Sequence, residues 1–389
     1  MFTDLDTGQL LIRRHRQTTY EYDHRRHAYR ALSPETIKAR VVRYLGAQGV
    51  SVTNRKVADI TTCLDAMVTC PADAELPFVA RLDPESHTVT AELRRYNWIT
   101  LKNGILDLDA TLAEQPLTDR LAPHNPNWVT TTALPYPYPT TAEGGECPRW
   151  HHFMDQTFEG DAERAAVLQE AFGYALTDSL HLEKFFMFTG LGSNGKSVVL
   201  DILTRMLGEE NVSSLTPDQM AKDTLLARLN GMLANVCGDL RYLEKVEEGL
   251  IKRIVSEEPL TADRKYLEPI TFRPHVKLYF ACNRPPHFTD TSNGIWRRLI
   301  VIPFNSTVVG ENIDIGLLAK IEPELPGILL WAMDGLKRLR VMRRFTESSE
   351  CRRAMRDHQC TCFPVLTFHE AATTEIVTGA TPAGQLWNA

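Results

Sequence analysis

The sequence predicts an α/β fold whose core has three layers, a mostly parallel sheet with helices on both faces. Between residues 185 and 305, strand-like apolar runs alternate with helix-like segments, a pattern typical of such sheets. A glycine-rich loop stands between the first of these strands and the next helix. A proline-rich stretch from Pro123 to Pro148 separates this core from a mixed region before it, and we expect a domain boundary there.

The composition is that of a globular protein. The chain has 389 residues, of which 43% are hydrophobic and 24% are charged, and this length suits two or three domains. It contains no apolar run long enough to span a bilayer, and its first residues lack the apolar core of a signal peptide. The eight cysteines are scattered, which indicates reduced thiols. We therefore expect a cytoplasmic protein without a membrane partner.

One group of cysteine and histidine side chains lies near the end of the chain, at Cys351, His358, Cys360 and Cys362. Their spacing matches none of the usual zinc patterns, because a single residue between two cysteines is too short for a zinc knuckle. The sequence therefore predicts no metal at this cluster.

Basic residues gather in two stretches although the formal net charge of the chain is −6. The first runs from Arg13 to Arg43 and the second from Lys337 to Arg356. Net charge is a poor guide when charges are segregated. The two stretches are either solvated helix faces or surfaces that bind phosphate groups, and the sequence leaves both readings open.

Local signals predict the elements around the core. Proline at the first turn after Ser33 predicts a helix from Pro34 to Leu45. The segment Ile99–Leu108 alternates like a strand and contains the turn signal Asn103-Gly104. Apolar spacing predicts a helix from Asp161 to Asp178, with Asp161 as its cap. A further helix is expected from Leu325 to Leu339, and core strands are expected at Phe185–Thr189, Leu233–Gly238, Val276–Cys282 and Leu299–Phe304.

The glycine-rich loop fits the phosphate-binding pattern G-x-x-x-x-G-K-[ST], and an apolar strand precedes it while a helix follows it, as the motif requires. Glycines let the backbone turn its N–H groups toward phosphate oxygens, and the helix N-terminus favours negative charge. Lys196 would neutralise the β- and γ-phosphates and Ser197 would bind Mg²⁺. The predicted nucleotide-binding residues are Gly190, Gly192, Ser193, Asn194, Gly195, Lys196 and Ser197.

Polar residues follow two later strands of the predicted sheet. Asp239 ends a buried run, and a carboxylate at the carboxyl end of a parallel strand lies at the ligand-binding edge. We interpret it as the acid that holds Mg²⁺ together with Ser197. Asn283 follows the next strand and would orient the attacking water, although an asparagine before Arg284-Pro285-Pro286 also suits an ordinary turn.

Two further segments carry arginine and lysine. Pro259–Arg273 reads as a hairpin with a tip that contains Arg264, Lys265 and Tyr266, residue types that grip a DNA backbone and stack on bases. Arg297 and Arg298 stand just before an apolar strand, where one of them could stabilise charge on the γ-phosphate of a neighbouring subunit. An ordinary surface hairpin and surface arginines are the alternatives.

In their order along the chain, these segments resemble the phage and plasmid primase-helicase family, whose motor is close to that of the poxvirus primase-helicase. The resemblance runs from about Cys147 to Leu336. It is carried by Phe172-Gly173-Tyr174-Ala175-Leu176, the loop from Gly190 to Ser197, Gly238-Asp239, Pro259 to Lys265, Asn283-Arg284-Pro285-Pro286, Trp296-Arg297-Arg298, Leu325-Pro326-Gly327-Ile328 and Trp331-Ala332. Asn103-Gly104-Ile105-Leu106-Asp107 resembles the family's segment upstream of the motor.

The resemblance implies a superfamily 3 DNA helicase of phage or plasmid replication in a bacterial host, with an AAA+-like core and ATP sites between the subunits of a hexameric ring. It implies 3′ to 5′ movement on single-stranded or forked DNA, with a primase or initiator as a further partner. By matching positions, Lys196 and Ser197 bind ATP and Mg²⁺, Asp239 is the Walker B acid, Asn283 is sensor 1, Arg297 or Arg298 is the finger that acts in trans, and Lys265 lines the channel.

The expected domains are a mixed N-terminal region at residues 1–134, a helical domain at 135–183, the ATPase core at 184–310 and a C-terminal helical region at 311–389. Leu240 stands where many P-loop ATPases carry a second acid, so Asp239 acts alone or Glu244 assists it. Asp107-Leu108-Asp109 is too short a match for a primase centre and is read as structural. A replication initiator or assembly ATPase without processive unwinding remains the alternative function.

Overall fold

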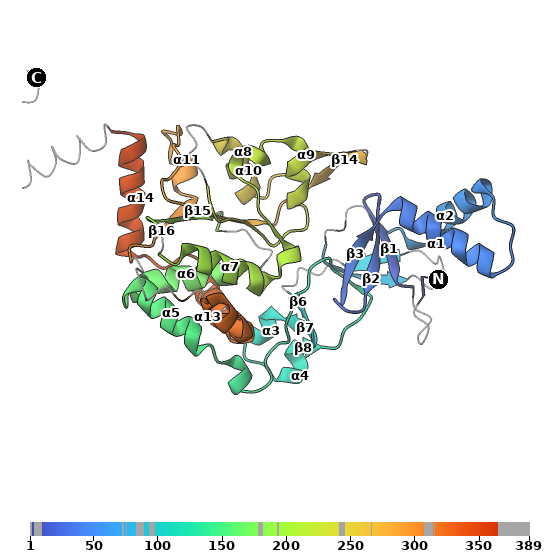
Figure 1. Cartoon of the computed structure of the whole chain (residues 1–389), viewed down its shortest axis with the longest axis horizontal. Helices are drawn as coiled ribbons and strands as arrows, with labels where there is room; N and C mark the ends of the chain where they lie inside the picture. The colour runs from blue at the N-terminus through green and yellow to red at the C-terminus, as the bar shows by residue number, and fades with distance from the viewer. Residues whose placement is uncertain are drawn as a thin grey trace, which may run out of the picture.

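The computed structural model describes residues 2–3, 10–71, 74, 76–82, 89–92, 98–177, 182–192, 194–240, 246–265, 267–306, 314 and 316–364 (Figure 1). Its largest sheet has five parallel strands in the order β11-β12-β15-β10-β16. These strands are β10 (Phe185–Thr189), β11 (Val212–Ser213), β12 (Ala234–Cys237), β15 (Lys277–Cys282) and β16 (Leu299–Pro303). The predicted α/β core with a parallel sheet is confirmed, and the sequence missed only β11, whose two residues are too few to form a pattern.

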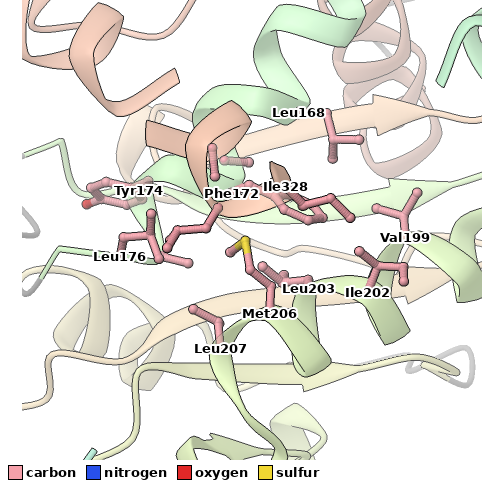
Figure 2. Packing of buried hydrophobic residues seen from close by; sticks show 14 of the residues in the cluster. Leu168, Phe172, Tyr174, Leu176, Val199, Ile202, Leu203, Met206, Leu207 and Ile328 are labelled. Atoms are coloured by element: carbon pink, nitrogen blue, oxygen red, sulfur yellow. The ribbon is translucent and has the colours of Figure 1, made fainter. Parts of the chain in front are cut away.

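Helices cover both faces of this sheet. Side chains alternate between the two faces along each strand, so a strand that is apolar throughout has to be covered on both. Phe186 and Phe188 of β10 point into one hydrophobic core and Phe185 and Met187 into the other. The first core contains α6 (Ala162–Tyr174), α7 (Lys196–Leu207) and α13 (Leu325–Met342), whose side chains Figure 2 shows packed together. The second contains α10 (Glu248–Val255) and part of α14 (Ser349–Cys362). This is the predicted three-layer arrangement.

Helix α13 packs against α6, although the two helices lie about 150 residues apart in the sequence. A Cβ atom at Gly173 would lie 2.4 Å from the carbonyl oxygen of Ala332, and one at Gly335 would lie 2.3 Å from that of Gln169. Glycine at both positions lets the two helix backbones touch. The predicted helix cap is also present, since the Asp161 side chain accepts a hydrogen bond from Arg164 N at 3.0 Å.

The region before the core is built from small antiparallel sheets and a helix pair. Ser33 caps α1 as predicted, and Figure 1 shows α1 and α2 at the end of the molecule farthest from α14. The segment Ile99–Leu108 forms two paired strands around Asn103-Gly104. The elements are β1 (Ile12–His15), β2 (Thr18–Asp23), β3 (Ala28–Leu32), α1 (Pro34–Ala47), α2 (Asn54–Val68), β4 (Phe78–Leu82), β5 (Val89–Glu92), β6 (Trp98–Leu101), β7 (Gly104–Asp107), α3 (Leu108–Leu112), α4 (Leu117–Arg120), β8 (Leu121–Ala122) and β9 (Trp128–Val129).

The proline-rich stretch expected to be a linker packs firmly along the molecule. The Tyr136 hydroxyl donates to the carbonyl oxygen of Met206 at 2.7 Å. Asn103 donates to the carbonyl oxygen of Tyr138 and accepts from its N–H, both at 2.8 Å. The remaining elements are α5 (Pro148–Phe158), α8 (Pro217–Met220), α9 (Asp223–Leu226), β13 (Leu260–Arg264), β14 (Leu267–Phe272), α11 (Asn293–Trp296) and α12 (Leu317–Ile321).

The cysteine and histidine cluster belongs to helix α14. His358 is buried and its Nε2 lies 2.9 Å from the carbonyl oxygen of Pro286. Cys362 accepts a hydrogen bond from Phe288 N at 3.4 Å. In the described part of the chain, no three cysteine, histidine or acidic side chains are grouped so that they could hold a metal ion. Each helix in that part is too short or too polar to cross a lipid bilayer.

Candidate nucleotide-binding site

The phosphate-binding loop runs from the end of β10 into α7, and two of its glycines are sterically required. Gly190 has φ +146° and Gly195 has φ +87°, both outside the region that other residues adopt freely. A Cβ atom at Gly190 would lie 2.3 Å from both Asn194 Nδ2 and the carbonyl oxygen of Phe304. At Gly192, by contrast, a Cβ atom would meet none of the described residues beyond its chain neighbours within 4 Å. Ser193 lies outside the described residues.

Lys196 places its ammonium group inside the curve of the loop. Its Nζ donates to the carbonyl oxygen of Gly190 at 2.6 Å and to Asn194 Oδ1 at 2.9 Å. The side chain is buried, and this burial lowers the pKa of the Lys196 ammonium from its usual value. A partly desolvated cation attracts phosphate oxygens more strongly than one in water. Ser197 is exposed in the first turn of α7, where its hydroxyl is accessible.

Asn194 acts as an anchor of the loop. Its Nδ2 donates to the carbonyl oxygen of Phe304 at 2.9 Å, and its side chain is buried. Phe304 N in turn donates to the carbonyl oxygen of Thr189 at 2.7 Å. The loop is therefore closed onto the backbone that follows β16. The sequence grouped Asn194 with the nucleotide-binding residues, and the structure places its side chain against protein atoms.

Replacing Asn194 by alanine should destabilise the protein, because it leaves the buried carbonyl oxygen of Phe304 without a donor. Such a loss costs about 1–3 kcal/mol. We expect the chemical-denaturation midpoint of Asn194→Ala to fall accordingly. Leu191→Ala is the matched control, since Leu191 belongs to the same loop and is 79% exposed. Equal midpoints for the two variants would show that the anchor contributes nothing.

The carboxyl ends of β10, β12 and β15 meet at one edge of the sheet. Thr189 of β10 pairs with Cys282, and Cys237 of β12 pairs with Phe280. Asp239 follows β12 and Asn283 follows β15, and both are exposed. Leu240 N donates to the carbonyl oxygen of Ala281 at 2.8 Å, which holds the segment after β12 beside β15. The predicted acid and amide therefore lie at the edge that carries the phosphate-binding loop, and Glu244 lies outside the described residues.

A cavity of about 460 Å³ adjoins this edge and is walled by helix α14. Its lining includes Thr189, Asn283 and Arg284 from the sheet edge and Arg353 and Asp357 from α14. Cavities of this size hold small-molecule ligands. The sequence did not predict the contribution of α14, because it lies about 70 residues beyond Asn283 and no local pattern links the two segments.

Arg297 and Arg298 lie at the opposite end of β16 from the phosphate-binding loop, and their surroundings differ. Arg297 is exposed and forms an ion pair with Glu183 at 3.5 Å. Arg298 is buried, donates to the carbonyl oxygen of Gly294 and to Ser256 Oγ at 2.8 Å each, and pairs with Glu183 at 2.9 Å. A strand of five residues is roughly 16 Å long, so neither guanidinium reaches the loop of its own chain.

The predicted hairpin is present, and its tip approaches the N-terminal region (Figure 1). Arg264 pairs with Leu267 across the tip, donates from Nε to the carbonyl oxygen of Glu268 at 3.0 Å, and donates from Nη1 to Thr18 Oγ1 at 3.2 Å. Lys265 stands at the turn and is exposed. Tyr266 lies outside the described residues. Of the two basic residues at the tip, Arg264 is partly buried and bonded to Glu268 and Thr18, and Lys265 is exposed.

Comparisons with known proteins identify relatives of part of this chain. A family model described as a family of unknown function (DUF5906) matches residues 188–298, from β10 to Arg298. Putative helicase L207/L206 of Acanthamoeba polyphaga mimivirus is 26% identical over 218 residues, which cover 54% of this chain and 22% of that protein. Putative helicase 121R of Invertebrate iridescent virus 3 is 24% identical over 225 residues, which cover 55% and 23%. The match thus spans less than a quarter of the length of these relatives.

Two solved structures of the NrS-1 C-terminal region share the fold. One has a TM-score of 0.54 at 11% identity and covers 88% of this chain and 70% of its own. The other has a TM-score of 0.51 at 12% identity, with 87% and 72% covered. The chain is therefore a relative of the viral putative helicases with the fold of the NrS-1 C-terminal region, in agreement with the resemblance of its motifs to the primase-helicase family.

Proposed function

We propose that this chain is the ATP-driven motor of a superfamily 3 DNA helicase that acts in phage or plasmid DNA replication. The observation that carries the proposal is the placement of the phosphate-binding loop and Arg297 at opposite ends of the same sheet. A loop and an arginine so placed can complete one site only when two copies of the chain meet. This supports ATP sites between the subunits of a ring, for which a hexamer is the expected size.

Each residue of the sheet edge has a role in this proposal. Lys196 binds the β- and γ-phosphates, Asn283 orients the attacking water, and Arg297 of a neighbouring subunit stabilises the charge that develops on the transferred phosphate. The exposed hydroxyl of Ser197 and the carboxylate of Asp239 are oxygen donors of the kind that Mg²⁺ prefers. A bound Mg²⁺ would neutralise phosphate charge. Arg298 keeps a structural role because its guanidinium is already bonded within its own chain.

The relatives named putative helicases support DNA as the polymer on which the motor acts. Lys265 is the residue that we expect to hold a single strand, because it is an exposed cation at the turn of a hairpin. That hairpin lies in sequence between the strands that precede Asp239 and Asn283, so a change at either end could shift it along the DNA. Movement from 3′ to 5′ is the expected direction.

Lys265→Ala should keep the ATPase rate measured without DNA but lose its stimulation by single-stranded DNA and the unwinding of a forked duplex. The physical reason is that one phosphate contact is removed while the sheet edge is left intact. Lys38→Ala, which removes an exposed lysine of α1, should behave as wild type. Unwinding by Lys265→Ala at the wild-type rate in moderate salt would refute the hairpin mechanism. A wild-type protein that hydrolyses ATP and never unwinds would instead be a replication initiator or assembly ATPase.

A further inference from the structure

A surface cleft beside β16 gathers positive charge in a chain whose formal net charge is −6. The cleft has a volume of about 900 Å³ and lies between β16, the turn after α13 and the first half of α14. Among the described residues, its charged lining side chains are the cations Lys184, Arg343, Arg344, Arg352 and Arg356 and the carboxylate Glu347. We call it the α14 cleft.

Many cations of the two basic stretches serve the fold elsewhere. In the first stretch, Arg14 pairs with Asp65 and Arg40 pairs with Glu21. On α13, Lys337 pairs with Glu114, Arg338 with Glu170 and Arg340 with Asp109. These pairs join helices to neighbouring segments, so part of the arginine-rich pattern serves contacts within the chain. Four arginines of the second stretch, Arg343, Arg344, Arg352 and Arg356, line the α14 cleft.

Within the cleft, positive charge exceeds the negative charge that could balance it. Glu347 accepts ion pairs from Arg344 at 3.3 Å and from Arg352 at 2.9 Å, so one carboxylate serves two guanidinium groups. Arg352 and Arg356 are four residues apart on α14 and therefore lie on the same side of the helix. The pKa of Lys184 is lowered, first by burial and then by the nearby Arg297 and Arg298, while Glu183 acts in the opposite direction.

The character of the lining indicates the class of ligand. Protein partners are usually held by apolar or aromatic anchors that enter a pocket. In the α14 cleft, the apolar residues Val167, Leu299, Val301 and Phe345 are all at most 8% exposed, and Leu182, Ile300 and Met355 are half-buried, so the described lining offers no fully exposed apolar side chain. Guanidinium and ammonium groups at the rim suit the phosphates of a nucleic acid instead. A cleft of this volume is the size that holds a drug-sized ligand, which matches a short length of single strand better than a duplex.

We propose that the α14 cleft binds the phosphate backbone of single-stranded DNA, at a second place on the motor apart from the hairpin tip. The identification of the polymer as DNA rests on the function proposed above. The cleft lies on the side of the sheet that carries Arg297, whereas the hairpin tip lies beside the N-terminal sheet. One strand could therefore be held at two points on each subunit.

The test removes two cleft cations and compares them with two cations elsewhere. Arg352→Ala/Arg356→Ala keeps good helix formers in α14, and Arg43→Ala/Arg55→Ala removes the same charge from exposed positions of α1 and α2. The probe is a fluorescently labelled dT20 titrated at several salt concentrations. The cleft variant should bind dT20 about 10-fold more weakly in low salt, and its salt slope should fall by about 1.4, or about 0.7 for each lost contact. The control variant should match wild type, and ATPase without DNA should be unchanged in both.

Several results would overturn the inference. Unchanged dT20 affinity and slope in the cleft variant would show that the cleft does not touch the strand. Displacement of dT20 from the wild type by poly-glutamate at equal charge would indicate a site for acidic protein, and weaker binding of a blunt duplex with unchanged dT20 binding would indicate a duplex site. If the cleft variant loses dT20 affinity while Lys265→Ala unwinds normally, the cleft stands and the hairpin mechanism falls.

Discussion

Lys196→Ala is expected to lower the rate of ATP hydrolysis by at least about 100-fold, the usual cost of losing one group that stabilises transition-state charge. Lys196 is the cation inside the phosphate-binding loop, and its ammonium contacts only atoms of that loop among the hydrogen bonds observed for it. The fold should therefore survive, because the observed hydrogen bonds of this side chain stay within the loop and the bond from Asn194 to Phe304 is left in place. The measurement is phosphate release at saturating ATP, with the circular dichroism spectrum recorded in parallel.

Leu191→Ala is the control for this variant, since Leu191 lies in the same loop and its side chain is exposed. It should hydrolyse ATP at nearly the wild-type rate. Hydrolysis by a well-folded Lys196→Ala protein at the wild-type rate would remove the basis for the nucleotide site, and with it the proposed motor.

Arg297→Ala should lose hydrolysis by about 1,000-fold or more while it still binds nucleotide, because a finger in trans acts on the transition state and not on the fold. Arg298→Ala should behave differently. Its guanidinium is buried and bonded to Gly294 and Ser256, so its removal should destabilise the protein by about 1–3 kcal/mol. Nucleotide affinity, hydrolysis rate and denaturation midpoint, measured on both variants, separate the two roles.

Mixing experiments test whether Arg297 acts between subunits. Arg297→Ala protein mixed with Lys196→Ala protein should regain part of the activity, because some interfaces then join an intact loop to an intact arginine. Mixed assemblies have to be demonstrated independently, for instance by pull-down of one tagged variant with the other. Mixed assemblies without any recovered hydrolysis at any ratio would contradict a site shared between subunits.

The features that the sequence predicted correctly depend on local chemistry. The near-continuous apolar runs of β10 and β15 predict strands buried on both faces. Ser33 and Asp161 cap helices because their side chains accept hydrogen bonds from backbone N–H groups three residues later. The glycines of the phosphate-binding loop also reflect a local requirement, since Gly190 and Gly195 adopt positive φ angles that favour glycine.

Contacts between distant segments decided what the sequence left open. Arg297 and Arg298 are identical residues side by side, and only the positions of Gly294, Ser256 and Glu183 make one of them a buried structural group. The proline-rich stretch reads as a linker, yet the Tyr136 hydroxyl bonds to the end of α7. The identity of a residue and of its sequence neighbours does not predict such partners, because the partners belong to elements many residues away.

The same division applies to charge and to the candidate site. The sequence by itself determined a sheet with a phosphate-binding loop and polar residues after its strands, because strand pattern, glycine conformation and motif spacing are local properties. The tertiary structure alone decided which arginines are neutralised by carboxylates, which remain around the α14 cleft, and that Asn194 anchors the loop to Phe304. The physical reason is that ion pairs and buried hydrogen bonds depend on distances in space of about 3 Å, and separation along the chain does not set those distances.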